Sequence, residues 1–321
     1  MAKIVCSAKL FTDQIDRMRE AGHKAWIHES EGLIARDRLI AELSDADALI
    51  CQLTDRIDRD LIVSAPGLRI VANVAVGYEN VDVGAARGLG IVVTNTPDVL
   101  TEATADMTFA LLLAAARRVA EADAAVRRGE FPAWGLEQEL TGTDVHGTTL
   151  GIVGMGRIGT AVARRGCLGF GMRVLYHNRT RNEAAERELG AELVPFDRLL
   201  TESDFVCVHV PLTDETRHLF DRNAFARMRP ASILVNVARG PVVDEEALVH
   251  ALEAGEIAGA GLDVYEREPE VHPGLLRLRE RVVLAPHLGS ATHETRRSMA
   301  ALAVSNVIAV LSGQSPLTPV T

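Results

Sequence analysis

The sequence predicts an α/β protein with two open, doubly wound parallel sheets, and three observations support this prediction. Short β-rich runs alternate with helical stretches over the first hundred residues, a second alternation begins near residue 150, and a long helical pattern separates the two. Parallel strands need crossover connections, usually helices, so regular alternation is typical of such sheets. With 321 residues, 47% of them hydrophobic and 24% charged, the chain is long enough for two globular domains.

The first alternation predicts one sheet. Its strands are expected at residues 4–6, 25–27, 48–53, 69–74 and 91–94. Helical stretches are expected between strands, for example at residues 13–21 and 35–43. One long helix is then predicted from Thr101 to about Arg128, where Gly129 ends it, and an irregular stretch follows over residues 131–146.

The second alternation predicts the other sheet. Its strands are expected at residues 150–153, 173–176, 205–208, 233–236, 259–262 and 282–284. A last helix, residues 293–311, follows the final strand, and its position suggests that it returns to the first domain. We therefore expect a discontinuous first domain of residues 1–98 and 288–321 and a second domain of residues 99–287.

Composition argues against several classes of protein. A formal net charge of −10 disfavours nucleic-acid binding, which needs a basic surface. The four cysteines are scattered and form no C-x-x-C pair, which favours free thiols in a reducing cytoplasm over disulfides or a metal site. The N-terminus is too short and polar for a secretory signal, and the longest apolar run, residues 109–116, is too short to span a membrane. A cytoplasmic protein without membrane contact is expected.

An apolar strand, residues 150–153, runs directly into a G-x-G-x-x-G motif. Gly154 permits a tight turn, Gly156 lets the backbone approach a phosphate, and Gly159 lets the next helix pack closely. Arg157 and Ile158 open that helix, whose first N–H groups and positive dipole end suit a pyrophosphate. The motif alone is weak because glycines recur in turns, but the strand and helix around it predict a dinucleotide-binding domain.

The end of the next predicted strand indicates which dinucleotide binds. An NAD site usually has Asp or Glu about 20 residues after the glycines, where it binds the ribose hydroxyls. Here Asn178, Arg179 and Thr180 stand at that place, without a carboxylate. A guanidinium and a hydroxyl suit a 2′-phosphate, so NADP(H) is predicted in preference to NAD(H), which stays possible. In the alternative interpretation, Arg179 and Arg181 are solvated loop residues.

Three further polar residues each follow a predicted strand of the second sheet. These are Arg239 in N-V-A-R-G, Glu268 in D-V-Y-E-R-E-P and His287 in P-H-L-G-S. Ligands of doubly wound sheets bind at the carboxyl ends of the strands, so the three residues are expected to lie together. Taken singly, such a histidine is more often structural, and a glutamate before proline is usually a solvated loop residue.

These motifs, with L-G-I-V-G-M-G-R-I-G, resemble the D-isomer-specific 2-hydroxyacid dehydrogenase family. Further similar stretches are residues 73–82, 100–106 and 209–212, so the resemblance covers nearly the whole chain. The resemblance implies two Rossmann-like domains. One is a flavodoxin-like substrate domain, and the other is the dinucleotide-binding domain. Residues 129–134, 178–180 and 289–296 are most similar to glyoxylate/hydroxypyruvate reductases.

The resemblance implies a role for each polar residue. Arg239 would hold the substrate carboxylate and polarise its keto oxygen, while the N–H groups of Val76 and Gly77 hold the carboxylate from its other side. His287 would protonate the oxygen as hydride reaches the carbonyl carbon, with Glu268 orienting its ring. These residue types suit the reaction, because reducing a 2-keto acid places negative charge on an oxygen that then needs a proton donor and a fixed cation.

The resemblance also implies further contacts. The expected cofactor contacts outside the glycine motif and residues 178–180 are Thr104, His209, Val210, Pro211, Thr216, Val237, Ala238, Asp263 and Gly289. Leu53 and Trp134 would wall the substrate pocket, with Trp134 reaching in from a partner subunit. The alternative for Trp134 is an aromatic anchor for its own irregular segment.

The expected function is NADPH-dependent reduction of glyoxylate or hydroxypyruvate to the D-2-hydroxy acid. A homodimer is expected from the excess of apolar residues in the long helix. Two alternatives stay open. One is another activity on the same scaffold, on phosphoglycerate, formate, phosphite or a longer 2-hydroxy acid. The other is a non-enzymatic, nucleotide-sensing scaffold of the corepressor type.

Overall fold

The structure is a computed structural model that describes residues 1–30, 32–131, 133–137 and 139–320. The chain divides into two compact units. Unit 1 comprises Met1–Leu100 and Thr292–Thr321, and unit 2 comprises Thr101–Ala291. The boundaries predicted from the sequence lie after residue 98 and before residue 288. The expected functions of the two parts, substrate binding and dinucleotide binding, stay predictions.

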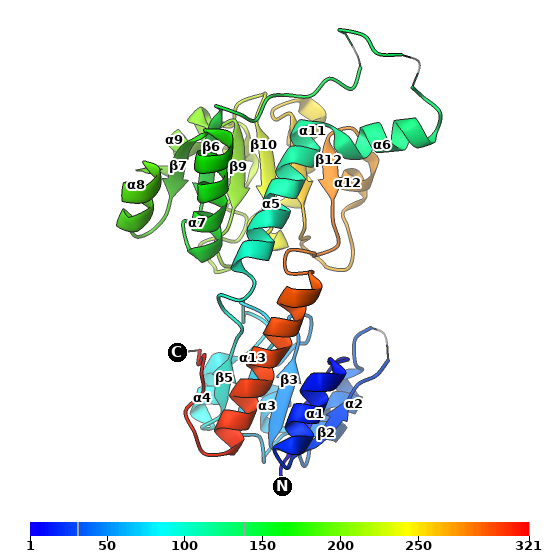
Figure 1. The fold of residues 1–321 in the computed structure, drawn as a ribbon, viewed down its shortest axis with the longest axis vertical. Helices are drawn as coiled ribbons and strands as arrows, with labels where there is room; N and C mark the ends of the chain where they lie inside the picture. Colours follow the sequence, from blue (N-terminus) through cyan, green and yellow to red (C-terminus); the bar gives the residue numbers. More distant parts are fainter. Residues whose placement is uncertain (31, 132, 138, 321) are drawn as a thin grey trace. The chain divides into compact units, whose positions relative to one another are not determined.

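Unit 1 contains a parallel sheet of five strands in the order β2-β1-β3-β4-β5. The strands are β1 (Lys3–Cys6), β2 (Lys24–Ile27), β3 (Ala48–Cys51), β4 (Ile70–Asn73) and β5 (Val92–Thr94). The helices are α1 (Thr12–Glu20), α2 (Arg36–Leu43), α3 (Arg59–Val63), α4 (Val83–Gly88) and α13 (His293–Leu311). Helix α13 packs on β3, β4 and α1, as Figure 1 shows, so the last helix completes the core of the first sheet.

Unit 2 contains a parallel sheet of seven strands in the order β12-β11-β10-β9-β6-β7-β8. The strands are β6 (Thr149–Val153), β7 (Arg173–His177), β8 (Glu192–Leu193), β9 (Phe205–Val208), β10 (Ile233–Asn236), β11 (Gly259–Leu262) and β12 (Val282–Leu284). From β6 the chain adds β7 and β8 on one side, and then returns to add β9 to β12 on the other side, so the strand order reverses between β6 and β9. Such a topological switch point is where doubly wound sheets bind ligands.

Helices cover both faces of this sheet and bury two apolar clusters against it. The α-helices are α5 (Thr101–Ala116), α6 (Val119–Arg127), α7 (Arg157–Arg164), α8 (Glu183–Leu189), α9 (Phe196–Glu202), α10 (Arg222–Phe225), α11 (Glu245–Ala254) and α12 (Pro273–Arg277). A π-helical turn, Arg165–Gly169, continues α7, and a 3₁₀ turn, Gly240–Val242, precedes α11. The predicted fold class, α/β with two parallel sheets, is confirmed.

The prediction of one long helix from Thr101 to Arg128 is wrong in one respect: the structure has two helices there, α5 and α6. Arg118 lies between them with a left-handed backbone, φ 52°. The carbonyl oxygen of Ala116 accepts a hydrogen bond from the N–H of Thr143 (2.9 Å) instead of one from the next helical turn. The guanidinium of Arg118 pairs with Glu121 (2.8 Å), which fixes the start of α6. A contact distant in sequence therefore ends the first helix.

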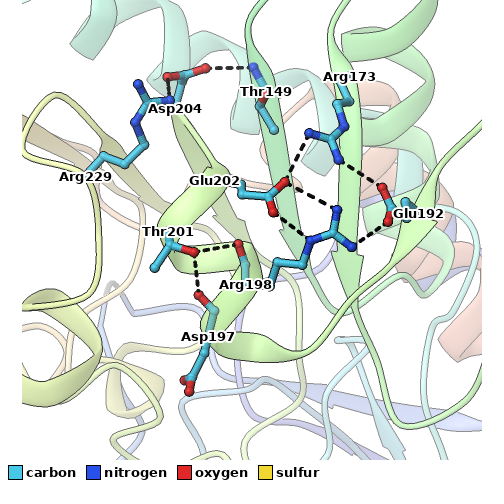
Figure 2. Close-up of polar contacts among 9 residues, drawn as sticks. All are labelled: Thr149, Arg173, Glu192, Asp197, Arg198, Thr201, Glu202, Asp204 and Arg229. Carbon is cyan, nitrogen blue, oxygen red and sulfur yellow. Dashed lines mark hydrogen bonds and ion pairs between the residues drawn. The ribbon is translucent and has the colours of Figure 1, made fainter.

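Every strand predicted from the sequence is present to within a residue or two, but the edge strand β8 was missed. This strand is short and exposed, so it carries no apolar pattern. Figure 2 shows what holds it: Glu192 accepts hydrogen bonds from Arg173 on β7 (2.9 Å) and from Arg198 on α9 (2.6 Å). Glu202 bonds the same two arginines, which closes a four-residue ion-pair network.

Candidate functional site

The glycine motif forms a tight turn between β6 and α7. Gly154 has φ 102°, and a Cβ atom there would lie 2.7 Å from the carbonyl carbon of His209. A Cβ at Gly159 would lie 2.1 Å from the carbonyl oxygen of Gly154. Gly156, the N-cap of α7, has no such neighbour within 4 Å. Packing therefore requires two of the glycines, while the third leaves the backbone open to a ligand, as a pyrophosphate would need.

His209 lies beside this turn, directly after β9. Its N–H donates to the carbonyl oxygen of Val153 (2.8 Å), which joins the carboxyl ends of β6 and β9. Burial lowers the pKa of the imidazole to about 3, so the ring is neutral. Its Nε2 atom is buried without a hydrogen-bond partner among the described residues. A buried polar atom in this position fits a site that is completed by a ligand.

The loop after β7 carries the residues predicted to select the cofactor. Asn178 donates through Nδ2 to the carbonyl oxygen of Thr180 (2.8 Å), while Arg179 and Thr180 are exposed. Asn182 donates through Nδ2 to the carbonyl oxygen of Met155 (3.0 Å), inside the glycine motif. The loop is thus fixed next to the glycine turn, as the ribose-binding loop of a dinucleotide site must be.

Glu268 and His287 are paired. The Nδ1 atom of His287 lies 2.8 Å from Oε2 of Glu268, and each side chain is 24% exposed. The other carboxylate oxygen accepts the N–H of Tyr265 (3.0 Å). Burial raises the pKa of Glu268. The hydrogen bond and charge of His287, then the N–H of Tyr265 and the charge of Arg239, outweigh burial and hold this pKa below its ordinary value. Glu268 is therefore an ionised carboxylate that orients the imidazole.

The turn that carries His287 is held by Asp263, at the end of β11. The N–H of His287 donates to the carbonyl oxygen of Asp263 (2.9 Å). The carboxylate of Asp263 accepts the N–H groups of Leu288 (2.6 Å) and Gly289 (2.7 Å). Burial of this side chain raises its pKa, against the effect of the two N–H bonds. Asp263, predicted as a cofactor contact, thus also fixes the turn of His287.

Arg239 follows β10, and Asn236 shapes its loop. Asn236 accepts the N–H of Ala238 (3.0 Å) and donates to the carbonyl oxygen of Arg239 (3.0 Å). The next residue, Gly240, packs so tightly on the loop after β11 that a Cβ atom would lie 1.9 Å from the carbonyl carbon of Tyr265. The loops of Arg239, Glu268 and His287 therefore follow three adjacent strands of one sheet, as predicted, and Arg239 acts electrostatically on Glu268.

Sequence reasoning missed the residues that brace these loops. Glu245 and Glu266 bond reciprocally: the N–H of Glu245 donates to Glu266 (2.8 Å), and the N–H of Glu266 donates to Glu245 (2.9 Å). The hydroxyl of Tyr265 donates to the carbonyl oxygen of Ala285 (2.9 Å), two residues before His287. The only sequence signal was the proximity of Tyr265 and Glu266 to Glu268 in D-V-Y-E-R-E-P.

The remaining cofactor candidates lie in unit 2 along the same strand ends. A Cβ atom at Gly289 would lie 3.4 Å from the methyl carbon of Thr104, so these two residues are adjacent. Thr216 donates to the carbonyl oxygen of Pro211 (2.6 Å) and closes the loop after β9 that contains Val210. Val237 is buried directly after β10, next to Ala238.

The substrate candidates Leu53, Val76 and Gly77 belong to unit 1. The carbonyl oxygen of Val76 accepts from Asn95 (2.8 Å), and that of Gly77 accepts from Asn73 (2.9 Å). Two amide side chains, neither identified from the sequence, therefore fix this loop. The neighbouring groove of about 400 Å³ is lined by Leu53 among other residues.

Trp134 is 77% exposed. A side chain with so much exposed surface does not anchor its own segment. The alternative interpretation of Trp134, as an aromatic anchor for the irregular segment, is therefore not supported within one chain. The similar segment 129–134 includes Pro132, which lies outside the described residues.

Within the described part of the chain, no cluster of three or more His, Cys, Asp or Glu side chains could hold a metal ion. None of the described helices is long and apolar enough to cross a membrane.

Comparison with known proteins decides the family. Residues 109–289 match the model of the D-isomer specific 2-hydroxyacid dehydrogenase, NAD binding domain. The chain belongs to the D-isomer specific 2-hydroxyacid dehydrogenase family. The resemblance seen in its motifs is thereby confirmed, and the protein is an NAD(P)-dependent dehydrogenase.

Relatives within the 2-hydroxyacid dehydrogenase family match over nearly the full length. A glyoxylate reductase from Thermococcus onnurineus is 51% identical over 319 residues, which cover 98% of this chain and 95% of the relative. A crystal structure of a protein from Thermus thermophilus has a TM-score of 0.92 at 46% identity, covering 99% of this chain and 100% of the other. An NADPH-dependent glyoxylate/hydroxypyruvate reductase from Sinorhizobium meliloti, in complex with NADP and malonate, has a TM-score of 0.84 at 37% identity, covering 100% and 97%.

Proposed function

We propose that the protein reduces glyoxylate, and also hydroxypyruvate, to the 2-hydroxy acid with NADPH, giving the D isomer where the product is chiral. The observation that carries this proposal is the Glu268–His287 pair, 2.8 Å apart, on strand ends adjacent to that of Arg239. The names of the relatives, glyoxylate reductase and NADPH-dependent glyoxylate/hydroxypyruvate reductase, support the substrate and the cofactor.

Arg239 holds the carboxylate of the keto acid. Its planar guanidinium meets a carboxylate through two parallel hydrogen bonds and never loses its charge. The same cation stabilises the negative charge that develops on the keto oxygen during reduction. In a chain with a net charge of −10, it also provides the local positive charge that an anionic substrate needs. The contacts of Leu53, Val76, Gly77 and Trp134 with the substrate stay predictions.

His287 supplies the proton. Glu268 occupies Nδ1, so the proton that leaves is the one on Nε2. One hydride to the carbonyl carbon and one proton from His287 to the carbonyl oxygen together give the alcohol, so the reaction balances.

The residues that would hold the dinucleotide are those of the glycine turn and of the loop after β7. The open backbone at Gly156 would face the pyrophosphate, and Arg179 with Thr180 would meet a 2′-phosphate. When bound, the reduced nicotinamide supplies the hydride. Asn178, Arg179 and Thr180 provide no carboxylate that would repel the 2′-phosphate, which supports NADPH in preference to NADH.

The variant His287→Ala tests the assigned chemistry. Loss of the proton donor should lower kcat for glyoxylate reduction at least about a hundredfold, since general acid catalysis contributes 10² to 10⁴. The Kd for NADPH, measured by fluorescence titration, should change little. Near-normal turnover of the variant would show that His287 is not the acid.

We also propose that the protein forms a homodimer through α6 and the segment after it. Val126, Phe131, Trp134 and Leu136 are each more than half exposed there, and so much apolar surface favours burial against a second copy. Sedimentation equilibrium should show a dimer that the double variant Phe131→Ser/Trp134→Ser weakens. The control Leu168→Ser, which changes an exposed leucine elsewhere, should leave the dimer intact. A monomeric wild-type chain would contradict the proposal.

A further inference from the structure

The loop after β7 contains two arginines, but they are not equivalent. Arg181 donates from Nε to Oε2 of Glu186 (2.6 Å), a residue of helix α8. Arg179 is exposed and forms no hydrogen bond or ion pair with another described residue, although its charge contributes to lowering the pKa of Glu215. One guanidinium is thus already neutralised, while the other is available to an anion.

Glu186 is itself firmly held. Its Oε1 atom accepts the hydroxyl of Tyr176 (2.6 Å), and its side chain is only 15% exposed. The hydroxyl of Tyr176 in turn accepts the N–H of Asn182 (2.9 Å). The hydrogen bond from Tyr176, and then that from Arg181, lower the pKa of Glu186, so it is a carboxylate at neutral pH. Arg181 is therefore bound to an oriented anion and not to a mobile surface residue.

This pair lies at the adenosine end of the dinucleotide site. Asn182 caps α8 through the N–H of Ala185 (3.1 Å), and donates to Met155 in the glycine motif (3.0 Å) and to Thr160 on α7 (3.2 Å). The last two residues of the loop are thereby fixed: Asn182 is tied to the glycine turn and Arg181 to Glu186. In doubly wound nucleotide-binding sheets, the end of this strand meets the ribose.

We propose that Glu186 is a specificity-determining residue, which withholds Arg181 from the 2′-phosphate and so limits the preference for NADP(H) over NAD(H). This inference rests on the proposed NADP(H) site. With Arg181 bound to Glu186, Arg179 is the guanidinium that meets the 2′-phosphate. Releasing Arg181 gives the phosphate a second charge-assisted partner, while NAD(H), which lacks this phosphate, gains nothing.

The test compares the Kd values of NADP⁺ and NAD⁺, measured by isothermal titration calorimetry on the intact protein. Glu186→Gln should keep the acceptor for Tyr176 but release Arg181, and should raise the Kd ratio of NAD⁺ to NADP⁺ by about fivefold to tenfold. Glu188→Gln is the matched control: this residue of the same helix pairs with Arg164 (2.6 Å), and its loss should leave the ratio unchanged. The single variant Arg181→Ala should change the ratio by less than about twofold.

The double variant Glu186→Gln/Arg181→Ala separates release of Arg181 from simple removal of a negative charge. If release is the cause, the ratio returns to that of Arg181→Ala. An unchanged ratio in Glu186→Gln, or an equal increase in the double variant, would overturn the role of Glu186. Arg179→Ala should lower the ratio at least about tenfold. If it did not, the NADP(H) site itself would be wrong, which is a different failure from that of Glu186.

Discussion

The backbone of His287 has a left-handed conformation that a histidine does not adopt without support. Its φ is 56°, in a region that costs a non-glycine residue about 1–3 kcal/mol. Asp263 compensates, because its carbonyl oxygen and both carboxylate oxygens accept three successive N–H groups of the turn. With Glu268 on Nδ1, backbone and ring are both fixed before any substrate binds. This preorganisation suits the proposed role of His287, which is to deliver a proton in one direction.

The variant Glu268→Gln tests how the carboxylate acts on His287. The amide keeps nearly the same shape but loses the negative charge beside Nδ1 of His287. We expect kcat for glyoxylate reduction to fall at least about tenfold, because the ring loses the charged partner that orients it, while the Kd for NADPH changes little. Tyr265→Phe is the control, since it removes the hydroxyl bond to Ala285 and leaves the carboxylate charge intact. An unchanged kcat in Glu268→Gln, or an equal fall in Tyr265→Phe, would contradict the assigned role.

The carboxylate of Glu268 also makes the stability of the fold depend on pH. Its pKa in the folded chain is lower than the ordinary value of 4.5, so the unfolded chain takes up its proton first as the pH falls. The stabilisation is fully present above pH 4.5 and is lost as the pH falls through the folded-state pKa. Urea unfolding should show that wild type has a higher free energy of unfolding than Glu268→Gln near neutral pH. This difference in free energy should become smaller as the pH falls below 4.5. A difference independent of pH would mean that the carboxyl charge is not responsible.

At the scale of elements, two glycines of the turn between β6 and α7 serve different purposes. Gly159 is needed for packing, and in the proposed site Gly156 is needed for binding of the dinucleotide. A methyl group at Gly159 would lie 2.1 Å from a backbone oxygen, so Gly159→Ala must move the helix and should destabilise unit 2 as well as weaken dinucleotide binding. Gly156→Ala meets nothing within 4 Å and should fold normally, yet weaken NADPH binding at least about tenfold. Melting curves and fluorescence titration distinguish the two. Equal NADPH binding by Gly156→Ala and wild type would show that the pyrophosphate is not there.

The strands and their ends were predictable because the sequence pattern there is local. A buried parallel strand is a short apolar run, and the first polar residue after it marks the edge of the sheet. Arg239, Glu268 and His287 could therefore be placed at adjacent strand ends from the sequence. The family resemblance also implied that Glu268 orients the ring of His287, and the two side chains do lie in contact. The left-handed turn that presents His287, and its three hydrogen bonds to Asp263, needed the structure.

The features that were missed depend on contacts between distant residues. The break between α5 and α6 follows from the bond between Thr143 and Ala116, which no helical pattern reveals. Strand β8 is held by arginines of two other elements and not by apolar residues. The reciprocal pairing of Glu245 with Glu266 is equally hidden, because separate carboxylates in a sequence predict solvated side chains.

At the scale of the whole molecule, the proposed function requires an acidic chain to bind anionic ligands through a few arginines. The net charge of −10 provides no general attraction for a keto acid or a dinucleotide. Several arginines of unit 2 are paired with carboxylates, as Arg173 and Arg198 are in the network of Figure 2. In the proposed function, binding of anions depends on particular guanidinium groups at strand ends: Arg239 would bind the substrate and Arg179 the cofactor.

The most direct test is the ratio of kcat/KM values for glyoxylate, hydroxypyruvate and pyruvate, each with NADPH and with NADH. We predict turnover of glyoxylate and hydroxypyruvate with NADPH, at least about tenfold lower kcat/KM with pyruvate, and lower kcat/KM for every keto acid with NADH. Tight binding of NADPH without oxidation by any of the three keto acids would contradict the account and favour a nucleotide-sensing scaffold.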